Sequence, residues 1–184
     1  MGFGSIVVLA LFAFVAITIF KGVRIVPQGY KWIVQRLGKY HTTLNPGLNF
    51  VIPYVDEVAY KITTKDIVLD IPSQEVITRD NAVLVMNAVA YINITTPEKA
   101  VYGIENYSWA IQNLVQTSLR SIVGEMDLDD ALSSRDHIKA KLKAAISDDI
   151  ADWGITLKTV EIQDIQPSNT MQAAMEAQAA AERQ

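Results

Sequence analysis

Near its start the chain has a long apolar segment without a charged side chain. The segment runs from Phe3 to Phe20, which as an α-helix would be about 27 Å long, against roughly 30 Å for the hydrocarbon core of a bilayer. A cleaved secretory signal is the alternative, but no Lys or Arg precedes the run and no small-x-small site follows it. We therefore predict an uncleaved transmembrane anchor over residues 1–22. Its candidate lipid-facing side chains are Phe3, Ile6, Val7, Leu9, Leu11, Phe12, Phe14, Ile17 and Phe20.

The basic residues after this segment predict its orientation. Lys21 and Arg24 follow the apolar run directly, whereas the residues before Ile6 carry no charged side chain. Positively charged flanks of a membrane helix usually remain on the cytoplasmic side. The sequence therefore predicts a single-pass protein with its N-terminus outside and its main domain in the cytoplasm.

The composition excludes several classes of protein. Hydrophobic residues make up 50% and charged residues 20% of the chain, which is enough apolar surface for a folded domain. Because 16 Lys and Arg stand against 20 Asp and Glu, nucleic acid is not an expected partner. The chain has no cysteine, and its two histidines are His41 and His137. We therefore expect neither disulfides, nor thiolate catalysis, nor a multi-histidine metal site, nor a cofactor.

Stretches rich in β-formers predict an antiparallel β module after the anchor. Lys31–Leu37 is such a stretch, and Gly38 follows it as a turn residue. Asp66–Ile71 is predicted to be a short strand that ends at Pro72. Arg79–Asn81 separates two further apolar runs, and because Asp and Asn tolerate a positive φ, it predicts a β-hairpin.

After the hairpin the apolar period changes from two to about 3.6 residues, which predicts helices. Thr96 and Pro97 are expected to start a short helix. Ser108 is expected to cap a longer helix that ends at Gly124, and Ser134 to open the next one. The apolar side chains expected on the buried faces of the two longer helices are Ile111, Leu114, Val115, Leu119, Ile122 and Val123, then Ile138, Leu142, Ala145, Ile146 and Trp153.

The last part of the chain is predicted to form a strand followed by a helix. Ile155–Ile165 alternates again, with a phase slip between Leu157 and Val160 that predicts a β-bulge. From Ser168 onward Ala, Gln, Glu and Met dominate, which are strong helix formers, and no C-capping residue follows. We therefore expect this helix to continue beyond residue 184 in the natural protein.

These residues resemble a known family, the stomatin, prohibitin and flotillin superfamily with its SPFH (band 7) domain. The resemblance covers nearly everything from Val23 onward and is closest to the bacterial stomatin-like branch, whose anchor is also a single N-terminal helix. The matching stretches are Val26–Tyr30, Val34–Tyr40, Pro46–Pro53, Gln74–Asn81, Leu119–Gly124, Leu128–Arg135 and Trp153–Ile165.

The resemblance implies an α+β fold and a function. The implied order is a transmembrane helix over residues 1–22, a mainly β SPFH subdomain over 23–94, an α/β SPFH subdomain over 95–166, and the start of a long coiled-coil helix over 167–184. The implied function is that of a non-enzymatic scaffold in the bacterial inner membrane. Many copies would form rings or cages that enclose a patch of lipid, organise membrane microdomains and support quality control together with a membrane-bound protease.

A second membrane contact is a further hypothesis. Leu48–Val55 is dominated by large apolar residues, and side chains of this kind could dip into the membrane interface. The candidates are Leu48, Phe50 and Ile52. An ordinary core strand is the alternative, because periodicity alone does not assign so short an apolar run.

Two candidate assembly surfaces stand out. Met171 and Met175 form a weak apolar seam in the terminal helix. Arg135, Lys139 and Lys143 recur every four residues and form a basic stripe, which could meet Asp129 and Asp130 of a neighbouring copy. The alternatives for the stripe are two solvated faces or an ion pair inside one protomer.

No set of side chains in the sequence predicts catalysis. Ser133, Ser134, Asp136 and His137 are suitable residue types, but within one helical turn they point around the axis and do not converge. Two other classes stay open as alternatives to the scaffold. One is a membrane-tethered enzyme whose catalytic part lies beyond residue 184, and the other is an accessory subunit of a channel or transporter.

Overall fold

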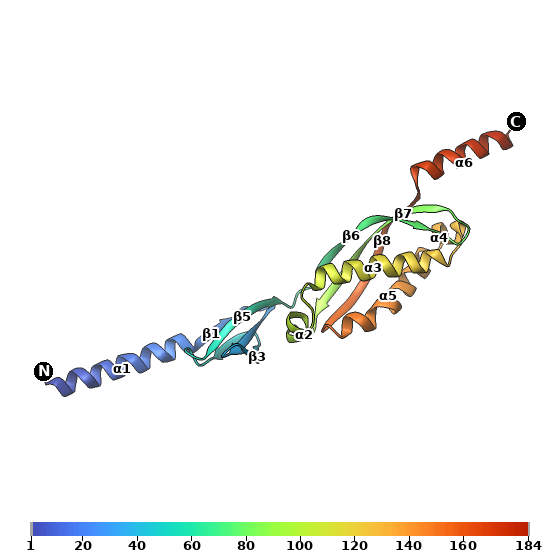
Figure 1. The fold of residues 1–184 in the computed structure, drawn as a ribbon. Helices are drawn as coiled ribbons and strands as arrows, with labels where there is room; N and C mark the ends of the chain where they lie inside the picture. The colour runs from blue at the N-terminus through green and yellow to red at the C-terminus, as the bar shows by residue number, and fades with distance from the viewer. Residues whose placement is uncertain (1, 184) are drawn as a thin grey trace. The chain divides into compact units, whose positions relative to one another are not determined.

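The computed structural model describes residues 2–183, which group into two compact units. Unit 1 ends at Lys65 and unit 2 begins at Asp66. In Figure 1 unit 1 is drawn in blue to cyan and unit 2 in green to red. The mixed α+β class predicted from the sequence is confirmed.

Unit 1 contains one long helix and five short strands. The helix is α1 (Phe3–Gly22), and the strands are β1 (Val23–Val26), β2 (Tyr30–Arg36), β3 (Lys39–Leu44), β4 (Gly47–Phe50) and β5 (Asp56–Thr63). β1 pairs antiparallel with β4 as a two-stranded ribbon, and β3, β2 and β5 form an antiparallel sheet in that order. A small core of Val26, Val34 and Leu44 holds these strands together, with Trp32 packed against it. The strand predicted at Lys31–Leu37 is therefore confirmed as β2.

Unit 2 is an antiparallel sheet of three long strands covered by helices. The strands are β6 (Ile67–Ile77), β7 (Val83–Ile94) and β8 (Ile155–Pro167), in the order β6-β7-β8. The helices are α2 (Pro97–Tyr102), α3 (Tyr107–Gly124), α4 (Leu128–Ser133), α5 (Arg135–Ala151) and α6 (Asn169–Glu182). Figure 1 shows α3 and α5 lying side by side along one face of the sheet. The core between them includes Met86, Leu119 and Leu142, each fully buried.

The predicted β-hairpin is confirmed. β6 and β7 are antiparallel neighbours, with Ile77 opposite Val83. Asn81 has a φ of 66°, which Asn tolerates better than most residues. The Thr78 hydroxyl accepts from the Ala82 backbone N–H at 3.0 Å and closes the turn.

The prediction that Pro72 ends its strand is wrong. β6 continues through Pro72 to Ile77, and its register with β7 shifts between Ile71 and Gln74. A bulge is one of the few places in a sheet where a residue without an N–H fits. The Gln74 side chain then donates to the Gln116 backbone carbonyl in α3 at 2.8 Å, so the bulged segment is tied to a helix.

The predicted β-bulge in the last strand is confirmed. Thr159 pairs with Tyr91, and the next pair joins Leu157 to Ile92, so that Lys158 is the extra residue. The phase slip in the sequence falls at this residue. A second shift leaves Gln163 without a partner in the ladder.

Two details of the helices differ from the prediction. α3 is capped by Asn106, whose side chain accepts from the Trp109 N–H at 3.1 Å, and Ser108 lies inside the helix. Asn caps helices at least as well as Ser. Both Asn106 and Ser108 precede the first apolar residue of the stripe, so the pattern alone does not distinguish the two. Ala145 in α5 is exposed, and Ile150 completes the buried face instead.

The two compact units divide the chain at a different point from the predicted subdomain boundary after Ile94. β8 pairs with β7 along almost its whole length. β6 and β7, which precede residue 95, therefore form one sheet with β8, which follows it, and the helices between β7 and β8 cover that sheet. The backbone changes from one unit to the other between Lys65 and Asp66.

Candidate membrane and assembly surfaces

The helix α1 is long and apolar enough to cross a membrane. The side chains predicted to face lipid are exposed in the chain: Phe3, Ile6, Val7, Leu9, Leu11, Phe12, Phe14, Ile17 and Phe20. A helix with apolar side chains on all sides is unstable in water and suits a bilayer.

The β1–β4 ribbon beside this helix has one apolar face. Val23 pairs with Phe50 and Ile25 with Leu48, and because side chains alternate along strands, all four lie on the same side. The exposed fractions are 69% for Ile25, 63% for Leu48 and 68% for Phe50. The adjoining loop exposes Ile52 at 50%. Leu48, Phe50 and Ile52 are therefore exposed in the chain, whereas Val51 of the same segment packs against the core of unit 1, and contact with lipid stays a prediction.

The loop after β4 is packed against the anchor. The Val51 N–H donates to the Gly22 carbonyl at 2.8 Å, at the last residue of α1. The ring of Tyr54 stacks on that of Phe14, with centroids 6.3 Å apart and planes within 5° of parallel. Phe14 lies six residues before the end of the apolar run at Phe20, which is about 9 Å along a helix. The loop that carries Tyr54 therefore folds back alongside the part of α1 that the sequence assigns to the bilayer.

Asp56 fastens this end of unit 1. Its carboxylate accepts from Arg36 Nε at 2.7 Å and Nη2 at 3.1 Å, and from the Ile52 backbone N–H at 3.0 Å. The Asp56 side chain is only 3% exposed. The Arg36 guanidinium, with the Ile52 N–H, lowers the pKa of the Asp56 carboxyl to about 2. The pair joins the end of β2 to the start of β5 and to the loop that packs on α1.

The two units carry opposite net charge. Residues 1–65 contain seven Lys and Arg and two Asp and Glu, which gives unit 1 a formal net charge of +5. The whole chain has −4, so the remaining residues, 66–184, carry −9. The unit that holds the anchor is therefore the basic one.

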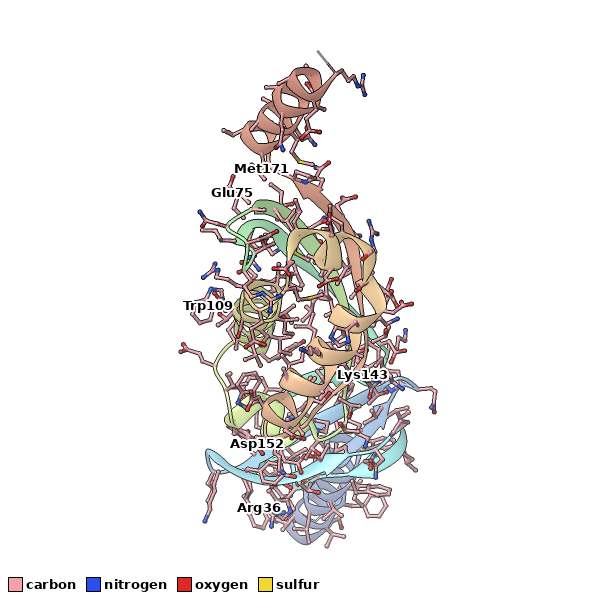
Figure 2. All side chains as sticks on the ribbon, turned by 90° about the vertical axis from the view of Figure 1, so that its right-hand side faces the viewer. Arg36, Glu75, Trp109, Lys143, Asp152 and Met171 are labelled. Atoms are coloured by element: carbon pink, nitrogen blue, oxygen red, sulfur yellow. The ribbon has the colours of Figure 1, made fainter. Side chains whose placement is uncertain are left out.

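The predicted basic stripe on α5 contacts β8 of the same chain. Arg135 donates to the Gln163 carbonyl at 3.3 Å, and Lys143 donates to the Lys158 carbonyl at 3.3 Å. Gln163 and Lys158 are the two residues that the bulges leave outside the ladder. Between them, Lys139 forms an ion pair with Glu161 at 2.5 Å and lowers the pKa of that carboxyl. Figure 2 labels Lys143 on this helix.

This arrangement has a simple geometric reason. Four residues of helix advance about 6 Å and two residues of strand about 6.6 Å, so a cation at every fourth helical position meets successive sites along the strand. β8 is an edge strand, and edges are commonly protected by charged side chains. Lys139 therefore forms the ion pair inside one protomer that was one of the alternatives for the stripe. A role of the stripe between protomers stays a prediction.

Exchanging the two charges of the Lys139–Glu161 ion pair distinguishes a role in packing α5 on β8 from a role between protomers. We expect Lys139→Glu to weaken the packing of α5 on β8, because the new carboxylate faces Glu161, and Lys139→Glu/Glu161→Lys to restore it. Thermal unfolding followed by circular dichroism measures the effect. If the double variant is as stable as the wild type but no longer assembles, Lys139 also contacts a neighbouring copy.

Asp129 and Asp130, the predicted partners of the basic stripe, lie at the start of α4. Asp127 occupies the N-cap position, and Asp129 and Asp130 lie in the first turn, where the helix dipole favours negative charge. Asp127 forms an ion pair with Arg79 at 2.7 Å. Asp129 and Asp130 therefore lie at a helix start, and their pairing with another copy stays a prediction.

The terminal helix α6 is exposed at every described residue except Met171, which is half-buried. Ser168 caps it by accepting from the Met171 N–H at 3.2 Å, and the helix starts where the sequence predicted. None of its described residues is buried, and Met175 is 41% exposed. Figure 2 shows Met171 near its start, and both views show α6 extending away from the sheet. Residues 2–183 therefore do not bury the apolar seam of Met171 and Met175.

The comparisons with known proteins agree with the resemblance. The model of the SPFH domain / Band 7 family matches residues 24–184. The chain belongs to this family. A human protein named stomatin-like protein 2, mitochondrial, is 38% identical over 158 residues, which cover 86% of this chain and 44% of that protein. SPFH proteins are generally membrane-associated scaffolds.

Two uncharacterised relatives match almost the whole chain. One, from Methanocaldococcus jannaschii, is 40% identical over 176 residues, which cover 96% of this chain and 85% of that protein. The other, from Mycobacterium tuberculosis, is 35% identical over 181 residues, which cover 98% of this chain and 48% of that protein. The chain thus spans about half the length of the mycobacterial and human SPFH relatives.

Sequence reasoning missed two residues of the candidate membrane surface, Ile25 and Tyr54. Ile25 could have been predicted to lie on one face of a strand with Val23, because apolar and basic residues alternate in Val23-Arg24-Ile25. Tyr54 lies in the predicted stretch but was not singled out, because only the structure shows its stacking on Phe14.

Proposed function

We propose that this chain is the membrane-anchored part of an SPFH scaffold. Many copies would assemble into rings or cages that enclose a patch of bilayer, organise membrane microdomains and support quality control together with membrane-bound proteases. The observation that carries the proposal is the apolar end of unit 1, which lies against the anchor and has no other cover among the described residues of the chain.

The depth of α1 in a bilayer supports this membrane contact. The apolar run is about as long as the hydrocarbon core is thick, so α1 has little freedom to slide out of it. Tyr54, stacked on Phe14, then lies below the headgroups, with Phe50 and Ile52 beside it in the chain. Each large apolar side chain buried there contributes roughly 1.5–3 kcal/mol. Several together would hold unit 1 against the membrane.

The exposed helix α6 supports assembly. A lone helix of this length is marginal in water, because most helical stability comes from packing an apolar face. Parallel neighbours would supply that face through Met171 and Met175. Copies related by a closed rotation present two different surfaces to each other and form rings.

The charge of unit 1 predicts the side of the membrane. With a formal net charge of +5 next to the anchor, we expect residues from Val23 onward to lie in the cytoplasm. A protease added outside intact spheroplasts should then leave both units whole, and digestion should occur only after lysis. Cleavage in intact spheroplasts would mean that the domain lies outside.

Negative-stain images of the full-length protein extracted in mild detergent test the scaffold itself. We expect closed rings or cages of many copies. Monomers with hydrolytic activity of their own would favour a tethered enzyme. A strict one-to-one complex with a transport protein would favour an accessory subunit.

A further inference from the structure

The turn between β2 and β3 carries a large apolar residue in an unfavourable backbone conformation. The turn has two residues, Leu37 with a φ of 51° and Gly38 with a φ of 80°. This is the conformation of a type I′ hairpin turn, in which Asn or Asp usually precedes Gly. A left-handed conformation is strained for a residue such as Leu, because its Cβ comes too close to the following carbonyl oxygen. Folding of the hairpin therefore does not explain a leucine at this position.

The side chain of Leu37 does not stabilise the core of unit 1 either. It is 82% exposed, so its contribution to packing within the chain is small. An isolated exposed leucine is common on protein surfaces. Strain and exposure together at the tip of a hairpin are less common and indicate a role outside the fold of the unit.

The hydrogen bonds around Leu37 place it beside the loop that packs on the anchor. Its N–H donates to the Val55 carbonyl at 3.2 Å, next to Tyr54, whose ring stacks on Phe14 of the anchor. The preceding residue, Arg36, is fixed by both of its hydrogen bonds to Asp56. The tip of the hairpin is thus held beside the loop that folds back along α1.

We propose that Leu37 is a membrane-inserting residue and that the β2–β3 hairpin is a second point of contact with the lipid leaflet, beside the loop of Phe50 to Tyr54. The inference rests on the proposed membrane contact of unit 1 and extends it to a segment separate in sequence. The occupant is the acyl-chain region of the leaflet at the C-terminal end of α1. Lys39, two residues after Leu37 in the chain, is exposed and would meet lipid phosphates.

Single cysteines provide the test, because the chain contains none. An environment-sensitive fluorophore is attached at Leu37→Cys in the full chain reconstituted in vesicles, and quenching by lipids with a nitroxide on the acyl chain is measured. Phe50→Cys reports on the membrane contact in the proposed function. Asn81→Cys is the matched control, since Asn81 also lies at a hairpin turn with a positive φ of 66° but in the unit without the anchor.

We expect the label at position 37 to be quenched as strongly as that at position 50, and several-fold more than that at position 81. Quenching at 50 but not at 37 overturns the insertion of Leu37 and leaves the proposed function intact. Quenching at neither position overturns both. Because a labelled cysteine could disturb the turn, the wild-type chain is also photolabelled with acyl-chain diazirine lipids. Adducts at Phe50 without adducts at Leu37 likewise contradict the proposal.

Discussion

Replacing Ala174 by proline in α6 should dissociate the large assembly and leave both units folded. Proline removes the N–H that the helix needs at this position and clashes with the preceding turn, at a cost of about 3 kcal/mol per helix. The cost recurs in every copy, and it falls on a helix none of whose described residues is buried in the isolated chain. Size-exclusion chromatography with light scattering measures the mass of the assembly, and far-ultraviolet circular dichroism reports on the strands.

The matched control is Asn169→Pro at the first position of the same helix. Proline is tolerated there because the first N–H groups of a helix have no intrahelical acceptor. The preceding Ser168 has φ −60° and ψ 156°, an extended conformation that a following proline accepts. This variant should assemble like the wild type. Large oligomers that survive Ala174→Pro would mean that the preceding units associate without α6.

The parts of the fold that could be predicted from the sequence are those set by local chemistry. The uncharged run before Lys21 predicts α1, because a membrane-spanning helix requires only a segment that is long and apolar enough. The hairpin follows from Asn81, which tolerates the positive φ that the turn requires. The bulge at Lys158 follows from a visible slip in the alternation of β8.

The parts that could not be predicted depend on contacts distant in sequence. Pro72 was expected to end β6, but a bulge and a hydrogen bond to α3 accommodate it. The division of the chain at Lys65 follows from the pairing of β8 with β7, which no local pattern announces. The basic stripe of α5 was visible, but its partners on β8 required the structure.

For the candidate membrane site, the sequence supplied the apolar residues and the structure supplied their exposure. Periodicity did not distinguish a core strand from a membrane-facing segment for Leu48 and Phe50, because both interpretations require the same apolar residues. Leu37 breaks the usual preference for Asn at its turn position. Departures from local preference are expected at functional positions. The sequence pattern therefore does not predict the role proposed for Leu37, and only the backbone angles and the exposure of this residue indicate it.

Replacing Asp56 by asparagine should loosen the end of unit 1 that faces the anchor. The amide side chain of Asp56→Asn would keep an acceptor for the Ile52 N–H but lose the charged pair with Arg36, and hydrogen bonds to charged groups contribute about 1.5–3 kcal/mol each. We expect exchange of the Leu37 and Val55 amides to accelerate at least roughly tenfold in the full chain in detergent. Glu57→Gln is the matched control, because it removes the same charge from the neighbouring exposed residue and should leave exchange unchanged.

The pH dependence of the same bonds gives an independent check. The pKa of Asp56 is lowered from 3.8 to about 2 in the folded chain, so the folded state favours the ionised carboxylate. Its contribution to stability is therefore complete above about pH 4 and is lost as the pH falls through about 2. As the pH falls from about 4 to about 2, the amides of wild-type unit 1 should lose protection from exchange. The Asp56→Asn variant should not show this loss over the same range. Equal acid sensitivity of the two proteins would show that Asp56 does not fasten the loop, and that the strands alone hold Tyr54 against Phe14.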